Sequence, residues 1–239
     1  MRGLDKNIFI VVPCYNEESR LGSVLKGFLD SPYRFVFVND GSRDDTLAVL
    51  RNSVKPPNYV ISLDKNAGKA EAVRRGIEFI KTLDEFSQAE WVGYWDADMA
   101  APIGEIPRFI DFAELAGGAD AVYGSRVMRL GSVIKRSPFR HALGRVFCTL
   151  ISLMFGLESY DTQCGAKLFK KGALGAAFDA PFTSRWIFDV EIILRLRSFK
   201  QIECPLGRWE DVKGSKVAPL KIFLRVAEDI RKIYKKYGN

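Results

Sequence analysis

Phe35-Val36-Phe37-Val38-Asn39-Asp40-Gly41-Ser42 consists of four apolar, β-favouring residues followed at once by polar, turn-forming ones. The segment 91–98, Trp-Val-Gly-Tyr-Trp-Asp-Ala-Asp, has the same form. Apolar runs that end in Asp, Gly or Ser before a helical pattern are typical of βα units, and open α/β sheets bind ligands beyond the carboxyl ends of their strands. We therefore predict that Asp40, Asp96 and Asp98 line one crevice. A divalent cation and a nucleotide would fit there, because Asp-x-Asp projects two carboxylates to the same side of an extended chain.

Strand and helix patterns alternate around these two segments. Residues 7–13 form an apolar strand, and apolar residues recur at helical spacing from Leu21 until Pro32. The second strand, 35–38, is followed by a helix for which Ser42 or Asp44 is the expected N-cap. A third strand is expected at 59–63, with a helix after it. This alternation predicts an α/β fold with a largely parallel sheet and right-handed crossovers.

The pattern is less regular after Trp95. Short strands are predicted at 121–124 and 166–169, and a long apolar helix at 139–157. No linker rich in Pro, Gly or Ser divides the 239 residues, so we predict one domain. The four cysteines are scattered without metal-binding spacing, which indicates buried free thiols in a reducing compartment. The polar start, without a leader pattern, favours the cytosol.

The formal net charge of +7 favours a polyanionic partner. Basic residues concentrate at 126–145 and at 213–236. No nucleic-acid-binding motif accompanies them, whereas apolar stripes do, so we do not expect a nucleic acid partner. Residues 217–239 form a basic amphipathic pattern, which predicts a helix that either lies on anionic lipid or packs on the domain.

Six motifs, taken together and in order, carry a resemblance to a known family. They are Val11-Val12-Pro13-Cys14-Tyr15-Asn16-Glu17-Glu18, Val38-Asn39-Asp40-Gly41-Ser42-Arg43-Asp44-Asp45-Thr46, Asn66-Ala67-Gly68-Lys69, Asp96-Ala97-Asp98, Gly124-Ser125-Arg126 and Asp161-Thr162-Gln163-Cys164-Gly165. The chain resembles glycosyltransferase family 2 over nearly its whole length, and within it the polyprenyl-phosphate glucose or mannose synthases. The resemblance implies a GT-A type, Rossmann-like α/β domain with a mostly parallel mixed sheet flanked by helices.

The resemblance also implies a donor site in residues 1–115. Pro13, Tyr15 and Glu17 would line the nucleoside pocket, and Asp40 would accept a hydrogen bond from the base. Lys69 would assist the bound donor. Asp98 would coordinate Mg²⁺ or Mn²⁺ directly, and Asp96 would contact the ribose or the metal through water.

Residues 116–216 would form the acceptor half. By motif position, Arg126 and Arg140 would hold a lipid phosphate, with Lys216 behind them. A phosphomonoester is largely ionised at neutral pH, so it attacks without a general base. The expected enzyme is an inverting hexosyltransferase that uses a UDP-hexose, with glucose favoured, and acts at the inner face of a membrane as a peripheral protein.

Three alternatives stay open at this point. A saccharide or lipid-linked saccharide acceptor would need a carboxylate base, for which Asp161, Asp189 and Glu191 are available. A non-catalytic protein that binds nucleotide sugars would keep the donor motifs without turnover. Nucleotidyl transfer also uses paired carboxylates, but the chain lacks the Gly-rich basic loop expected for a nucleoside triphosphate.

Overall fold

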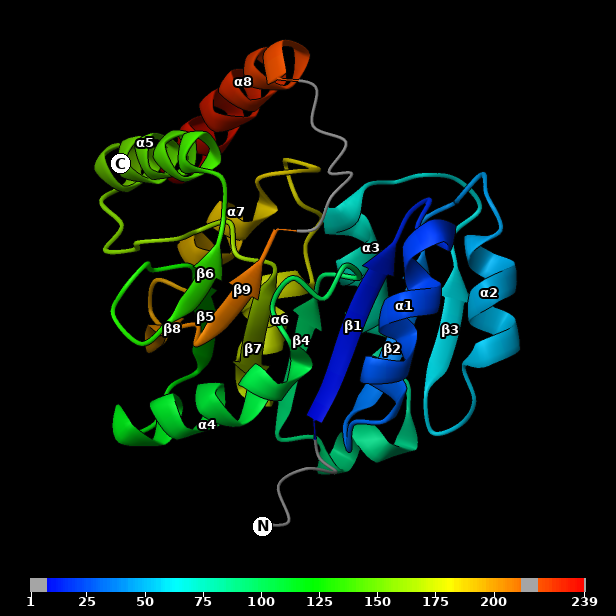
Figure 1. Ribbon diagram of the computed structural model, residues 1–239. Helices are drawn as coiled ribbons and strands as arrows, with labels where there is room; N and C mark the ends of the chain where they lie inside the picture. The colour runs from blue at the N-terminus through cyan, green and yellow to red at the C-terminus, as the bar shows by residue number, and fades with distance from the viewer. Residues whose placement is uncertain (1–7, 212–218, 239) are drawn as a thin grey trace.

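The computed structural model describes residues 8–211 and 219–238 (Figure 1). Its first half contains β1 (Ile8–Cys14), α1 (Glu18–Leu29), β2 (Arg34–Asn39), α2 (Thr46–Ser53), β3 (Tyr59–Ser62), α3 (Lys69–Lys81), η2 (Asp84–Gln88), β4 (Trp91–Trp95), η3 (Ile103–Glu105) and α4 (Ile106–Leu115). Its second half contains β5 (Ala121–Ser125), β6 (Val133–Lys135), α5 (Pro138–Phe155), β7 (Ala166–Lys170), η4 (Lys171–Ala173), α6 (Leu174–Phe178), α7 (Phe188–Arg195), β8 (Gln201–Pro205), β9 (Arg208–Glu210) and α8 (Pro219–Tyr237).

The main sheet has seven strands in the order β3-β2-β1-β4-β7-β5-β8. β1 pairs in parallel with β2 and β4, β2 with β3, and β5 with β8. Only β7 runs in the opposite direction, between β4 and β5. The predicted mostly parallel mixed sheet is therefore confirmed, and one continuous sheet joins the two halves of the chain.

Alternation along the central strands sorts helices to the two faces of the sheet. Ile8, Ile10 and Val12 of β1 pack in a core with residues of α1, α2 and α4. Phe9 and Val11 point the other way and pack with α3, α6 and α7. Both faces of these strands are buried, which explains why each reads as a continuous apolar run and not as an alternating one.

A third, smaller core joins α5, α7 and α8. Ile151 of α5, Val190 of α7 and Ile233 of α8 are all buried in it. Figure 1 shows α5 and α8 side by side beyond the sheet, on the side where the parallel strands end. The apolar face of α8 is thus covered by protein from Val226 onward, as the packing alternative for residues 217–239 requires.

The predicted N-cap of α2 is confirmed in part. Helix α2 begins at Thr46 and Asp45 precedes it, but Asp44 Oδ1 accepts a hydrogen bond from the Thr46 backbone N–H at 3.1 Å, which is the interaction expected of a capping side chain. Ser42 Oγ accepts a hydrogen bond from the Asn16 backbone at 3.1 Å, so it ties the end of β2 to the end of β1. The predicted buried, free thiols are confirmed for all four cysteines, and the reducing compartment stays a prediction.

Candidate active site

The ends of β1 and β2 form the first wall of the site. Cys14 lies opposite Asn39 in the parallel register, and the Asp40 backbone N–H donates to the Cys14 carbonyl at 2.9 Å. This register brings the segment Pro13–Glu17 beside Asp40. Tyr15 is 38% exposed, so part of its side chain is open to a ligand.

Asp40 has a structural role that sequence reasoning missed. Its carboxylate is buried and accepts hydrogen bonds from Asn66 Nδ2 at 2.9 Å, Ala67 N at 2.6 Å and Gly68 N at 2.9 Å. Burial raises the pKa of Asp40, while the two backbone donors oppose that rise. Asp40 therefore holds the 66–68 loop, and the base contact predicted for it stays a prediction.

The same loop connects Asp40 to the end of β4. Lys69, which follows Gly68, places its Nζ 2.5 Å from Asp96 Oδ1. Burial alone would lower the pKa of Lys69, but Asp96 and Asp189 together raise it. The two strand ends therefore converge as predicted, with residues 67–69 bridging them.

Asp98 supplies a second carboxylate next to Asp96. Its Oδ1 accepts from the Ala100 backbone at 3.0 Å. Burial and then the neighbouring charge of Asp96 raise the pKa of Asp98. Two hard oxygen ligands whose negative charges repel each other suit Mg²⁺ or Mn²⁺, with the remaining positions left for donor phosphates and water. Within residues 8–211 and 219–238, no group of three metal-ligating side chains exists.

Gly165 forms the floor under Asp96. The Asp96 backbone N–H donates to the Gly165 carbonyl at 2.9 Å. A Cβ at position 165 would lie 1.8 Å from Asp96 Oδ2, so the aspartate carboxylate fills the space that any other residue would need. The Asp161–Gly165 motif thus reaches the donor side of the site, which its position in the sequence did not reveal.

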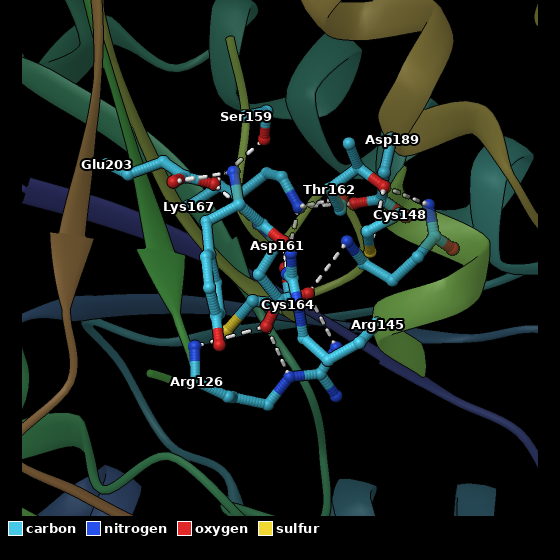
Figure 2. A network of polar contacts seen from close by, with 12 residues as sticks. Arg126, Arg145, Cys148, Ser159, Asp161, Thr162, Cys164, Lys167, Asp189 and Glu203 are labelled. Atoms are coloured by element: carbon cyan, nitrogen blue, oxygen red, sulfur yellow. Dashed lines mark hydrogen bonds and ion pairs between the residues drawn. The ribbon is translucent and has the colours of Figure 1, made fainter. Parts of the chain in front are cut away.

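The acceptor side contains a buried ion pair that sequence reasoning also missed. Arg126 donates to both oxygens of Asp161, through Nε at 2.6 Å and Nη2 at 2.8 Å (Figure 2). Their side chains are 13% and 6% exposed. Burial opposes ionisation of both groups, but the opposite charge prevails, raising the pKa of Arg126 and lowering that of Asp161 to about 2. The Arg126 charge is therefore already compensated within the protein.

Arg140, the second predicted phosphate ligand, is more accessible. Its Nη1 lies 2.7 Å from both carboxylate oxygens of Asp211, and its side chain is 41% exposed. A phosphate would share Arg140 with Asp211. Lys216, the third predicted ligand, lies outside the described residues.

Arg136 lies beside Arg126 at the same aromatic ring. Its guanidinium lies 5.9 Å from the centre of the Trp209 ring, and that of Arg126 lies 5.5 Å from the same ring. Burial and then the Arg126 charge lower the pKa of Arg136. No carboxylate among the described residues forms a salt bridge with it. We name Arg126, Arg136 and Arg140 the basic cluster; Arg136 was not among the phosphate ligands predicted by motif position.

The three carboxylates considered as general bases are all engaged. Asp161 is paired with Arg126. Asp189 lies 2.5 Å from Lys167 Nζ. Glu191 is fully buried and binds Arg195, Lys236 and the Thr183 backbone. None of the three is free to take a proton from an acceptor hydroxyl.

Comparison with known proteins shows the family. The profile of the family described as Glycosyl transferase family 2 matches residues 9–178. Dolichyl-phosphate beta-glucosyltransferase of Saccharomyces cerevisiae is 35% identical over 256 residues, which cover 95% of this chain and 74% of that protein. The Homo sapiens protein of the same name is 30% identical over 259 residues, covering 97% and 76%.

A likeness to solved structures supports the fold. Glucosyl-3-phosphoglycerate synthase from Mycobacterium tuberculosis, in complex with Mn²⁺, UDP and glucosyl-3-phosphoglycerate, has a TM-score of 0.64 and 18% identity. The match covers 97% of this chain and 80% of that chain. A structure of the same enzyme with phosphoglyceric acid gives a TM-score of 0.66.

Proposed function

The chain belongs to glycosyl transferase family 2, and from this premise we propose that it transfers glucose from UDP-glucose to a polyprenyl phosphate with inversion at the anomeric carbon. The family resemblance drawn from the six motifs is thereby confirmed. The names of the relatives in yeast and human support the sugar and the acceptor class.

The observation that carries the proposal is the basic cluster, together with the engagement of all three carboxylates considered as general bases. Asp161, Asp189 and Glu191 are each bound to a cation. An acceptor hydroxyl would need one of them for its proton, whereas a phosphate monoester, with a second pKa near about 6, is largely an anion at neutral pH. Arg136 and Arg140 would bind that anion and align one oxygen for attack, and Arg126 would shape the site through Asp161.

On the donor side, Tyr15 would stack on the base, and Asp40 would contact it while holding the 66–68 loop. Asp98 and Asp96 would hold Mg²⁺ or Mn²⁺, which when bound neutralises charge on the departing nucleoside diphosphate. Lys69 would keep Asp96 oriented and add a positive charge near the diphosphate. UDP and Mn²⁺ in the mycobacterial structural neighbour support this assignment.

An exposed apolar stripe on α5 supports peripheral contact with a membrane. Phe139, Leu143, Val146, Leu150 and Leu153 recur at intervals of three and four residues and are 54–77% exposed. Such a stripe with arginines beside it fits the interface of an anionic bilayer. None of the helices in the described part of the chain has the length and hydropathy of a membrane span. We place the contact on α5, since α8 packs its apolar face on protein from Val226 onward.

A transfer assay with purified protein, UDP-glucose, a short polyprenyl phosphate and Mn²⁺ or Mg²⁺ tests the proposal. We expect metal-dependent release of UDP and a glucosylated lipid. Arg136→Met and Arg140→Ala should each reduce transfer by about 100-fold, because the phosphate loses positioning as well as affinity, with little change in UDP affinity. Arg140→Lys should retain only part of the wild-type transfer rate, since an ammonium cannot bind a phosphate with the two parallel hydrogen bonds of a guanidinium. Arg51→Ala, on α2 outside the site, is the control.

Three results would contradict the proposal. Transfer to a saccharide but to no polyprenyl phosphate would favour the hydroxyl-acceptor alternative. UDP-glucose binding without UDP release would indicate a non-catalytic protein. If Leu143→Glu/Leu150→Glu sediments with anionic liposomes as well as Leu115→Glu does, the α5 contact is wrong; Leu115 is an exposed leucine at the end of α4.

A further inference from the structure

Lys167 is a fully buried cation in the middle of the fold. It belongs to β7, opposite Tyr94 of β4 in the antiparallel register. Its Nζ lies 2.5 Å from Asp189 Oδ1 of α7. The same Nζ donates to two backbone carbonyls, Thr162 O at 3.2 Å and Cys164 O at 2.6 Å (Figure 2). All three donor positions of the ammonium are therefore used.

The two carbonyls belong to the loop 159–165, which connects both sides of the site. Asp161 of this loop binds Arg126 in the basic cluster. Gly165 at its other end contacts Asp96. Lys167 thus fastens the section of chain between an acceptor-side residue and a donor-side residue.

The beginning of the same loop is held by a second charge. Glu203 of β8 accepts hydrogen bonds from Ser159 Oγ, Tyr160 N and Asp161 N at 2.8, 2.9 and 2.7 Å. Glu203 fixes the entry of the loop and Lys167 fixes its exit, as Figure 2 shows. The Lys167 ammonium therefore binds carbonyls of this loop, and the Glu203 carboxylate binds its N–H groups.

A buried ion pair is weak evidence for stability, because apolar residues of similar volume often replace one without loss. The cost of burying Lys167 and Asp189 in the core therefore calls for another reason. That reason is the pair of hydrogen bonds that Lys167 donates to the loop carbonyls of Thr162 and Cys164. Tyr94 OH donates to Asp189 and holds the anion in place beneath Lys167.

We propose that Lys167 is a positioning residue, which fixes the loop 159–165 so that Gly165 orients Asp96 and Asp161 orients Arg126. The inference rests on the proposed function, for which Asp96 and Arg126 lie on the donor and acceptor sides. Lys167 has no exposed surface and so touches neither substrate.

A pair of variants separates this role from simple charge compensation. Lys167→Met leaves Asp189 buried without its partner and should lower the thermal denaturation midpoint. Lys167→Met combined with Asp189→Asn removes both charges and should recover most of that loss. Neither variant can donate to the Thr162 and Cys164 carbonyls. The control is Lys170→Met, three residues along, whose ion pair with Glu90 is partly exposed.

The expected result is a kcat lower by roughly 10- to 100-fold in both the single and the double variant, with a smaller change in KM for UDP-glucose. Backbone amide exchange of the 159–165 segment should be faster in both than in wild type, and unchanged in Lys170→Met. Recovery of kcat and of slow exchange in the double variant would overturn the proposal and leave only charge compensation. Slow amide exchange of the 159–165 segment in a folded Lys167→Met variant would also overturn the proposal.

Amide exchange and UDP affinity do not depend on the acceptor, whereas kcat does. If wild-type protein glucosylates no polyprenyl phosphate, the proposed function fails, but amide exchange and Mn²⁺-dependent UDP affinity still decide the role of Lys167. If the wild-type enzyme does transfer glucose but both variants keep the wild-type amide exchange and UDP affinity, the role of Lys167 is refuted while the proposed function stands.

Discussion

Replacing Gly165 with alanine should inactivate the site while leaving the fold intact. The new Cβ would lie 1.8 Å from Asp96 Oδ2 and 2.2 Å from its Cγ. Ordinary contact between such atoms is about 3.5 Å, so the carboxylate must move by more than about 1 Å. A displacement of about 1 Å at a reacting centre can cost about 100-fold in rate, which is about 3 kcal/mol of transition-state stabilisation.

The movement also breaks the contact of Asp96 with Lys69 at 2.5 Å. We therefore expect kcat/KM for UDP-glucose to fall by about 100-fold, together with weaker Mn²⁺-dependent binding of UDP in calorimetric titration. Thermal denaturation should change little, because the clash is with a side chain at the crevice and not with backbone. Gly93 is the contrasting case: its Cβ would lie 2.1 Å from the Lys167 carbonyl inside the sheet, and alanine there should destabilise the fold.

Gly172→Ala provides the matched control, since a Cβ at that position meets nothing within 4 Å. It should leave both rate and stability unchanged. If Gly165→Ala transfers glucose at the wild-type rate with wild-type metal dependence, then the orientation of Asp96 seen here does not matter for turnover, and the assignment of Asp96 to the site is wrong.

Three further predictions concern charge. Asp98→Asn keeps the shape and removes a ligand charge, so transfer should be almost abolished with an unchanged denaturation midpoint; near-normal turnover, or equal activity in excess chelator, would contradict the metal assignment. Lys69→Met removes a positive charge that lowers the pKa of Asp98, so Mn²⁺-dependent UDP binding, titrated against pH, should fail at a higher pH than in wild type. Asp161 has a pKa of about 2, below its ordinary 3.8, so its stabilisation of about 2 kcal/mol is present above about pH 4 and lost as the pH falls towards 2. The difference in unfolding free energy between wild type and Asp161→Asn, from urea denaturation, should shrink across that window; a constant difference would show that the ionised pair does not stabilise the fold.

Sequence reasoning succeeded where local patterns determine structure. β1, β2 and β4 are buried on both faces, so each is a continuous apolar run, and their polar ends marked Asp40, Asp96 and Asp98. The short elements β6, β8 and β9 lack such a run, because their residues are partly exposed and owe their conformation to pairing with distant strands.

The site was predicted in its parts but not in its contacts. Arg126 is separated from its partner Asp161 by 35 residues, and no periodicity links them. The motif containing Gly165 was recognised, yet its contact with Asp96 depends on the strand pairing Trp95 to Ala166. Tertiary pairing of this kind decides whether an arginine is free to bind a ligand or already satisfied.

The reversed direction of β7 determines which loop can be changed in length without disturbing the sheet. The site lies at the edge of the sheet where the parallel strands end, so each parallel strand contributes the loop that follows it. Because β7 is antiparallel to β4 and β5, it contributes the loop that precedes it. The segment between Gly156, which ends α5, and Ser159 contains no paired strand residue, although its Leu157 packs against two of the cores. We therefore expect residues inserted after Leu157 to leave the strand register unchanged. Laboratory diversification for new lipid acceptors should begin with the length of that segment.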